Sequence, residues 1–300
     1  MLKSEIEMAI QAQDRESNAL VGIPREALAN LPIERNFATI VTGVRRCGKS
    51  TLLIQWTKQS RKRVVRVLFD DLRLMDFSAD DFVLLGKILV ERKAQAVVLD
   101  EVQDVRGWER FVAGLLSVGM TVLVTGSNAK MLSAELGTKL TGRHLDLRLD
   151  PFNYREFLRF RKRKASRAAF DEYLSVGGFP AYVQNRNRQL LVDLFNDILY
   201  RDVVVRYGIG NTMPIKQLAA YLLGHVGTRF APSRLKDAIH VQSAKTVLEY
   251  FDHLTECCLV HRLERFSDSP KARMLAQKKV YACDVGLVSA LERGEGDREG

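Results

Sequence analysis

The residues with the clearest chemical role lie in the stretch TGVRRCGKSTLL, from Thr42 to Leu53. Gly43, Gly48, Lys49 and Ser50 have the spacing G-x-x-x-x-G-K-S. Glycines at this spacing let backbone N–H groups turn inward around phosphate oxygens, while the lysine reaches the β- and γ-phosphates and the serine hydroxyl ligates Mg²⁺. The spacing therefore predicts a phosphate-binding P-loop that takes ATP with Mg²⁺. The candidate nucleotide-binding residues here are Gly43, Arg45, Arg46, Cys47, Gly48, Lys49, Ser50 and Thr51.

Two adjacent carboxylates end the apolar stretch VVLDE. The carboxyl end of a buried strand in a parallel sheet is the edge where ligands bind. Asp100 is expected to hold Mg²⁺ together with Ser50, directly or through water. Glu101 is placed to polarise a water for attack on the γ-phosphate, which favours hydrolysis over transfer to a second substrate.

Three further polar residues are candidates for the same site. The stretch TVLVTGSN brings Ser127 and Asn128 beside the carboxylates if the two strands are neighbours. Ser127 is the preferred sensor of the γ-phosphate, and the alternative is that both residues cap the next helix. Arg143 lies just before the last predicted strand. It is either a residue that reaches the nucleotide of an adjacent subunit or an ordinary surface arginine.

Short β-rich stretches alternate with helical ones in the first half of the chain, which predicts an α/β fold with a parallel sheet of five strands. The predicted strands are residues 37–42, 64–69, 96–99, 121–125 and 145–149. The first, third and fourth are almost wholly apolar and should be buried on both faces, whereas the last alternates and should lie toward an edge. The predicted helices are residues 50–59, 79–91, 108–116 and 129–140.

The chain becomes helical after Pro151. Apolar residues recur there at three- and four-residue steps, and VGGFP at Val176 to Pro180 interrupts them. From about Pro214, three short helical stretches precede LVHRLERF and KKVYACD, which read as a β-hairpin. Three helices followed by a hairpin is the order of a winged helix.

The composition is that of an ordinary globular protein. The 300 residues are 46% hydrophobic, enough for two or three domains, and no run approaches the length of a membrane helix. The N-terminus carries acids where a signal peptide would be apolar, so we expect a cytoplasmic protein. The four cysteines include no C-x-x-C pair and are expected to be reduced thiols.

The net charge of +10 is partly clustered. Residues 151–210 hold eleven Lys or Arg against six Asp or Glu, with RKRKASR at Arg161 to Arg167 as the densest run. This run predicts non-specific DNA contact, and the alternative is a solvated helix face. In the expected recognition helix, SAKTVLEYFDHLTE, Lys245 stands against three acids, which favours docking of that helix to the lid or to another subunit over base reading.

Six stretches together resemble a known family: GVRRCGKSTLL, VVLDEVQDVRGWE, VLVTGSNAKML, LTGR, PFNYREFL and GGFP. They are similar to the AAA+ ATPases of bacteria and archaea that carry a C-terminal domain of unknown function. The resemblance implies an ASCE-type P-loop domain, a helical lid, a winged-helix-like region and then a domain similar to restriction nucleases. It also implies that Ser127 is the sensor, that Arg143 is an arginine finger, and that Gly178 and Pro180 contact the base and sugar of the nucleotide.

The resemblance and the composition together give the expected organisation. The expected parts are an N-terminal helical segment (1–36), the ATPase core (37–150), a helical lid (151–210), a winged-helix-like domain (211–284) and the truncated start of a C-terminal domain (285–300). The chain ends in LERGEGDREG where the family continues, so we expect no folded nuclease-like domain and no catalytic role for Asp284.

Three functions fit these residues. The first is an ATPase whose hydrolysis cycle moves the lid and winged helix, with homo-oligomer formation and action on DNA as further options. The second is a nucleotide-gated interaction module that hydrolyses slowly. The third, a small-molecule phosphotransferase, is disfavoured because Glu101 would activate water beside the Mg²⁺ ligand.

Overall fold

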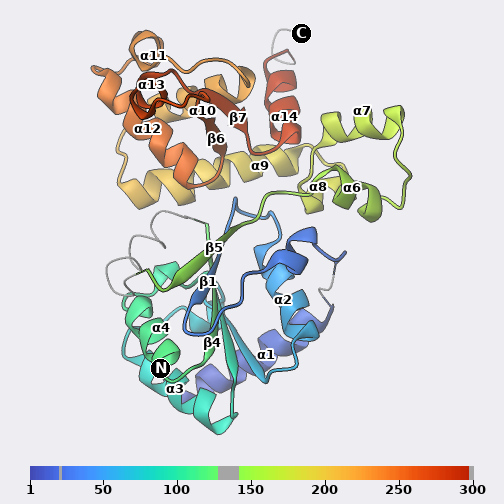
Figure 1. Ribbon diagram of the computed structural model, residues 1–300, viewed down its shortest axis with the longest axis vertical. Helices are drawn as coiled ribbons and strands as arrows, with labels where there is room; N and C mark the ends of the chain where they lie inside the picture. The colour runs from blue at the N-terminus through green and yellow to red at the C-terminus, as the bar shows by residue number, and fades with distance from the viewer. Residues whose placement is uncertain (20–21, 128–141, 297–300) are drawn as a thin grey trace. The chain divides into compact units, whose positions relative to one another are not determined.

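A five-stranded parallel sheet is the centre of the N-terminal half of the described chain (Figure 1). The structure is a computed structural model that describes residues 1–19, 22–127 and 142–296. The strands are β1 (Ala38–Thr42), β2 (Val64–Leu68), β3 (Ala96–Asp100), β4 (Thr121–Gly126) and β5 (His144–Arg148). Their order is β2-β3-β4-β1-β5, which confirms the predicted sheet and places the alternating last strand at an edge.

Burial follows the apolar pattern of the strands. Every residue of β1 and β3 is buried, and only the first residue of β4 is not. Helices α2 (Lys49–Gln59), α3 (Asp81–Glu91) and α4 (Trp108–Ser117) begin and end within two residues of the predicted bounds. Helix α2 lies on one face of the sheet, and α3 and α4 lie on the other (Figure 1). The helix predicted over 129–140 falls outside the described residues.

The N-terminal helix α1 (Lys3–Ala19) packs on the sheet through Ile6, Ala9 and Ile10, which belong to its hydrophobic core. The side chain of Gln13 donates to the carbonyl oxygen of Leu68 at 3.0 Å and accepts from the backbone N–H of Leu68 at 2.9 Å. Strand β2 is an edge strand, so its outer backbone groups need partners. The Gln13 side chain supplies both partners for Leu68.

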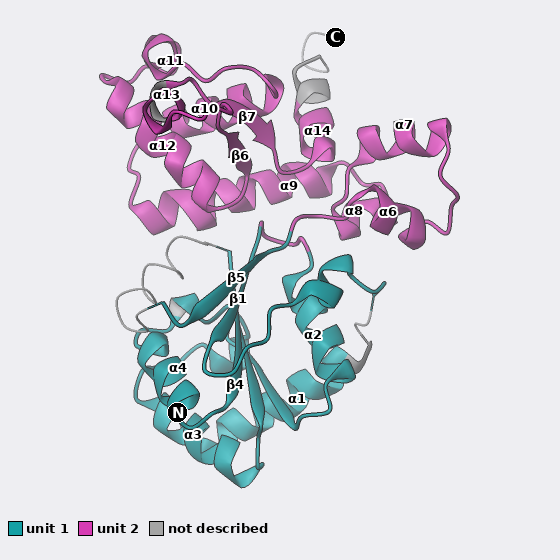
Figure 2. Cartoon of the chain, in the orientation of Figure 1, with its two compact units in different colours: residues 1–43, 48–149 teal, residues 44–47, 150–300 magenta. Residues whose placement is uncertain are grey.

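The chain divides into two compact units (Figure 2). The first comprises residues 1–43 and 48–149, and the second comprises residues 44–47 and 150–300. The second unit begins with α6 (Tyr154–Phe160), α7 (Arg167–Val176), α8 (Pro180–Asn185), α9 (Gln189–Asp197) and the π-helical segment η4 (Ile198–Val205). Helix α6 ends before the basic run, so residues 161–166 are a connection and not the helix face considered from the sequence.

Three helices and a hairpin complete the second unit, in the expected order. They are α10 (Met213–Gly224), α11 (Pro232–Ala238), α12 (Ala244–Glu256), and the antiparallel strands β6 (Val260–Leu263) and β7 (Lys279–Ala282). A short helix, α13 (Pro270–Leu275), lies between the strands and had not been expected. The last helix, α14 (Val285–Gly296), packs against α7, α9 and α10.

Within the described ranges, no helix is long and apolar enough to cross a membrane. All four cysteines are free thiols, in agreement with the expectation from the sequence.

Candidate nucleotide-binding site

The phosphate-binding loop connects β1 to α2. Gly48 precedes the helix with φ 105°, a conformation that favours glycine. Lys49 is the first residue of α2, and its side chain is only 4% exposed. The Lys49 Nζ donates to the carbonyl oxygen of Gly43 at 3.1 Å and lies 3.4 Å from Oε1 of Glu101. A helix N-terminus with a buried ammonium group is a site for an anion, because unpaired N–H groups and the helix dipole favour negative charge.

Asp100 ends β3 and is completely buried. The Thr125 hydroxyl donates to Oδ1 of Asp100 at 2.6 Å, the Ser50 hydroxyl also hydrogen-bonds to this carboxyl group, and Nη1 of Arg66 lies 3.5 Å from Oδ2. Burial and the neighbouring Glu101 raise the pKa of Asp100, while these hydrogen bonds and Arg66 act in the opposite direction. The carboxyl group therefore lies in a polar cluster inside the apolar sheet.

Glu101 follows directly and has a strained backbone, with φ 55° and ψ 42°. Left-handed conformations are unfavourable for a non-glycine residue and cluster at functional sites. The backbone N–H of Glu101 donates to the Thr125 hydroxyl at 2.9 Å, and Nε2 of Gln103 donates to Oε2 of Glu101 at 2.8 Å. Thr125 thus links the two carboxylate residues from the neighbouring strand β4.

Sequence reasoning missed Thr125 and Arg66. The only sequence signals were a polar residue at the end of an apolar strand and a charged residue in the middle of VVRVL. The missing information was the register, which pairs Leu68 with Asp100 and so places Arg66 two residue pairs away, on the same face of the sheet. A buried arginine needs partners, and Arg66 has two, the Asp100 carboxyl group and the carbonyl oxygen of Gln13, to which its Nη2 donates at 3.3 Å.

The donor set fits Mg²⁺. The Ser50 hydroxyl and the Asp100 carboxyl group are already in contact with each other, and both are hard oxygen donors of the kind that Mg²⁺ takes together with waters and phosphate oxygens. Ser50 and Asp100 are thus the residues that would hold the ion. The described residues contain no group of three or more His, Cys, Asp or Glu side chains that could form a separate metal site.

Arg25 is a second buried cation near the loop and was also missed. Its side chain is 4% exposed, and a Cβ atom added to Gly48 would lie 2.8 Å from its Nη1. The Gln55 side chain of α2 holds this segment, because its Oε1 accepts from the backbone N–H of Arg25 at 3.0 Å and its Nε2 donates to Ile23 O at 2.6 Å. The φ of Gly48 is thus the main reason for glycine here, and the absence of a side chain also leaves room for the Arg25 guanidinium group.

The tip of the loop, residues 44–47, groups with the second unit. Arg45 forms a two-point contact with Asp202, at 3.1 Å from Nε and 3.0 Å from Nη2, and Nη2 of Arg46 lies 3.3 Å from Asp197. Cys47 is completely buried. The side chains of Arg45 and Arg46 are therefore engaged by carboxylates, which leaves the backbone N–H groups as the expected phosphate contacts of this tip.

Ser127 and Arg143, the other predicted catalytic residues, lie at opposite ends of the sheet. Strand β4 is the neighbour of β3, which satisfies the condition on which the Ser127 prediction depended, and Ser127 is buried. Asn128 falls outside the described residues. Arg143 is exposed, and its carbonyl oxygen accepts from Ala38 N at 3.0 Å, at the amino end of β1. The phosphate-binding loop is at the opposite end of that strand.

The GGFP residues have a packing role inside the second unit. A Cβ atom at Gly178 would lie 2.1 Å from the carbonyl oxygen of Phe152, so no side chain fits there. The backbone N–H of Gly178 donates to Oδ2 of Asp284 at 2.6 Å, and Pro180 is in the first turn of α8, where proline is favoured. Packing by itself thus requires glycine at 178.

Asp284, for which no catalytic role is expected from the sequence, is a buried hydrogen-bond acceptor that joins the GGFP segment to the start of α14. It is 6% exposed and also accepts from the backbone N–H of Gly286 at 2.8 Å. Burial raises the pKa of Asp284 to about 6, although the N–H donors of Gly178 and Gly286 act to lower it. Desolvation is thus the larger effect.

The raised pKa of Asp284 gives a testable pH dependence. The carboxyl group has its ordinary pKa, near 3.8, in the unfolded chain and a pKa of about 6 in the folded one. Stability from this group is therefore fully present below pH ~4 and is lost as the pH rises through ~6. A ¹³C carboxyl NMR titration should give a midpoint near pH 6 for one signal that is missing in Asp284→Asn. A midpoint near 4 would contradict the burial argument.

Comparison with known proteins supports a P-loop ATPase fold. Residues 35–158 match a family described as an AAA domain, and residues 167–298 match a domain of unknown function, DUF8612. A Walker-type ATPase of Pyrococcus abyssi has a similar fold, with a TM-score of 0.54 at 15% identity over 93% of this chain and 95% of that one. These findings show an AAA domain over residues 35–158 with a P-loop ATPase fold, and they confirm the expected C-terminal domain of unknown function.

Two relatives are uncharacterized proteins. One, from Methanocaldococcus jannaschii, is 30% identical over 270 residues, which are 83% of this chain and 61% of the relative. The other, from Haemophilus influenzae, is 27% identical over 275 residues, which are 85% of this chain and 69% of the relative. The chain thus spans about three fifths to two thirds of the length of these proteins.

Proposed function

We propose that the protein is a Mg²⁺-dependent ATPase that couples hydrolysis to movement of its helical lid and winged-helix-like region. The observation that carries the proposal is the cluster of Lys49, Ser50, Asp100 and Glu101 at the carboxyl ends of β1 and β3, in which the ammonium group of Lys49 is buried. A buried cation at a helix N-terminus, next to two carboxylates, suits a bound phosphate chain and its metal ion.

Lys49 supplies the charge for binding. Its ammonium group is held between the carbonyl oxygen of Gly43 and the carboxylate of Glu101. A phosphate chain in the loop would take this ammonium group as its partner, because a charge-assisted hydrogen bond to phosphate is stronger than one to a neutral carbonyl. Arg25, beside Gly48, adds a second buried positive charge near the same loop.

Glu101 supplies the base for hydrolysis. Its side chain is partly exposed, and Gln103 orients one of its oxygens. The base accepts a proton from water as the water oxygen bonds to the γ-phosphorus and the bond from that phosphorus to the β–γ bridging oxygen breaks. Ser127 is the proposed sensor that orients this water from the end of β4.

Asp100 and Ser50 have a different task, which is to hold Mg²⁺. The bound ion would neutralise charge on the phosphate oxygens. Thr125 and Arg66 fix the Asp100 carboxyl group from the two neighbouring strands. The Thr125 hydroxyl also accepts a hydrogen bond from the backbone N–H of Glu101. The orientations of Asp100, the proposed metal ligand, and Glu101, the proposed base, are therefore linked through one hydroxyl group.

The partners and the assembly of the proposed ATPase are inferred from the family resemblance. Contact of the nucleotide with Gly178 and Pro180, homo-oligomer formation through Arg143, and a restriction-nuclease-like domain in the longer relatives all follow from the family resemblance. The basic run at 161–167 is a weaker DNA surface than its sequence indicates. Arg161 and Arg163 pair with Glu172, and Arg167 pairs with Asp171.

Glu101→Gln should separate binding from catalysis. We expect near-parental affinity for Mg-ATP and turnover lower by at least ~10²-fold, the usual scale of a general base. Asp100→Asn should instead weaken the Mg²⁺-dependent part of ATP binding, and it keeps the shape of a buried side chain that contacts Arg66. Calorimetric titration with and without Mg²⁺, beside a phosphate-release assay, measures both effects. Identical behaviour of the two variants would contradict the separate roles.

A nucleotide-gated interaction module that hydrolyses slowly is the second candidate function. The ion pair between Lys49 and Glu101 favours it, because a base held by an ammonium group is less available to water. The same assay distinguishes the two functions. A parental turnover that Glu101→Gln does not lower would favour the module over the ATPase.

A further inference from the structure

The hairpin of the second unit has a third strand-like segment beside it. An isolated antiparallel bridge pairs Arg229 with Lys279, and the backbone N–H of Gly227 donates to Val280 O at 2.7 Å. On its other side, β7 pairs with β6, so that Lys279 lies opposite Leu263 and Tyr281 lies opposite His261. The segment before α11, β7 and β6 therefore form one narrow three-strand ribbon.

One face of this ribbon carries like charges in direct opposition. Residues paired across strands point to the same face, so Arg229, Lys279 and Leu263 form one row. All three side chains are exposed, whereas Val280, next along β7, is buried. Two cations directly opposite each other destabilise a sheet. No ion pair joins Arg229, Lys279 or the nearby Arg265 to a carboxylate in the described part of the chain. An anionic ligand would relieve this repulsion.

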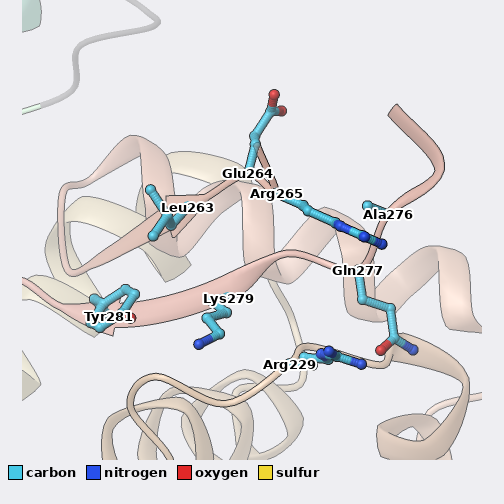
Figure 3. Close-up of a pocket in the computed structure, with 8 residues that line it drawn as sticks. All are labelled: Arg229, Leu263, Glu264, Arg265, Ala276, Gln277, Lys279 and Tyr281. Carbon is cyan, nitrogen blue, oxygen red and sulfur yellow. The ribbon is translucent and has the colours of Figure 1, made fainter. Parts of the chain in front are cut away.

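The same face is hollowed. A pocket of about 540 Å³ is lined by Arg229, Leu263, Glu264, Arg265, Ala276, Gln277, Lys279 and Tyr281. Figure 3 shows the cations around the hollow on three different segments, with the Glu264 carboxylate directed away from them. Glu264 is paired with Lys278 at 3.0 Å, and this partner lowers the pKa of Glu264. The one acid of the lining is thus already neutralised by a lysine outside it.

Composition separates this surface from the other basic segments. Residues 259–283 contain six Lys or Arg against two Asp or Glu, and Arg229 adds a seventh cation from its own segment. The basic run at 161–167 has its arginines paired, and in α12 Lys245 faces Glu249. Tyr281 adds an aromatic ring that is 40% exposed, beside the exposed Leu263. Cations next to an exposed aromatic ring suit a nucleic acid, whose phosphates pair with the cations while a base or sugar contacts the ring.

We propose that this ribbon face, formed by Arg229, Arg265, Lys279 and Tyr281, binds the phosphodiester backbone of a nucleic acid. The binding is independent of base sequence, because the cations contact phosphates and no base-reading pair of side chains accompanies them. The proposal concerns a different part of the molecule from the ATP site and does not depend on hydrolysis.

The test compares two triple variants of the full chain. Arg229→Gln/Arg265→Gln/Lys279→Gln removes three charges from the ribbon face. Lys58→Gln/Lys87→Gln/Lys216→Gln removes three charges from exposed lysines outside both the ribbon face and the basic run at 161–167, and is the matched control. Fluorescence anisotropy with labelled duplex and single-stranded DNA of arbitrary sequence, over a series of salt concentrations, measures the affinity and its salt slope.

The ribbon variant should lose affinity, and the slope of log K against log salt should become shallower by about 2 to 3, close to one per lost phosphate contact. The control should keep the parental slope. Tyr281→Ala should weaken single-stranded binding by about 5- to 150-fold if a base stacks on the ring, and should change duplex binding little. Absence of DNA binding by the parent, or an equal change of slope in the ribbon variant and the control, would overturn the proposal.

Discussion

Lys49→Ala is expected to abolish ATP binding that calorimetry can detect. The ammonium group is the positive charge that the P-loop itself directs at the phosphate site, and its side chain is 4% exposed, so water does not replace it. Removal of the lysine leaves the phosphate chain with backbone N–H groups and loses the charge-assisted hydrogen bonds, which are the strong ones. Removal also frees the Glu101 carboxylate, which would then repel the γ-phosphate.

Lys58→Ala is the matched control for this variant. Lys58 lies in the last turn of the same helix, α2, and is exposed. The Lys58→Ala variant should bind Mg-ATP with the affinity of the parent protein. Circular dichroism and thermal melting of both variants check that α2 and the sheet are intact. Parental affinity in a folded Lys49→Ala protein would show that G-x-x-x-x-G-K-S at residues 43–50 is not a nucleotide-binding loop.

The sheet was predictable because its strands are short apolar stretches separated by helices with regular apolar spacing. Burial on both faces favours apolar residues, and β1 and β3 are buried over their whole length and apolar except for Thr39, Thr42 and Asp100. The alternating pattern of LDLRL correctly placed β5 at an edge. The edge position of β2 was not predictable in this way, because Gln13 of α1 satisfies part of its outer backbone from a distant place in the sequence.

The candidate site was predictable where one short segment contains all the residues of a motif at the spacing that fixes its backbone shape. The spacing of Gly43, Gly48, Lys49 and Ser50 is such a segment. Thr125, Arg66 and Arg25 were missed because each reaches the site through strand register or through a contact across the fold. For the same reason, charge counts placed the basic surface at residues 161–167, since sequence alone does not show that Glu172 and Asp171 neutralise it.

Arg143 is placed at the wrong end of the sheet to serve its own P-loop. In the register of β1 and β5, His144 pairs with Ala38 and Arg148 pairs with Thr42. Arg143 therefore lies about five residues, or ~16 Å at ~3.3 Å per residue, from the level at which the P-loop begins. Its side chain is exposed. Two roles fit this position, an arginine finger for a neighbouring subunit and an ordinary surface residue.

If Arg143 is an arginine finger, Arg143→Ala should bind ATP like the parent and hydrolyse it 10³- to 10⁵-fold more slowly, roughly the scale of a lost finger. A finger stabilises charge that develops on the transferred phosphoryl group, so its loss affects the transition state and hardly affects the bound ground state. If the finger acts on a neighbour, only assembled subunits have complete sites. The specific activity of the parent should then rise with protein concentration. Arg61→Ala, an exposed arginine before β2, is the comparison variant and should keep the parental turnover.

Mixing two inactive variants decides whether Arg143 acts in trans. Arg143→Ala lacks the finger but keeps the nucleotide site, and Lys49→Ala lacks the nucleotide site but keeps the finger. In a mixed assembly, some interfaces join an intact nucleotide site to an intact finger, so a fraction of the parental activity should return. No return on mixing, together with activity of the parent that does not depend on its concentration, would make Arg143 an ordinary surface residue. The proposed ATPase would then stabilise its transition-state charge from within one chain, where the buried side chains of Lys49 and Arg25 lie beside the phosphate-binding loop.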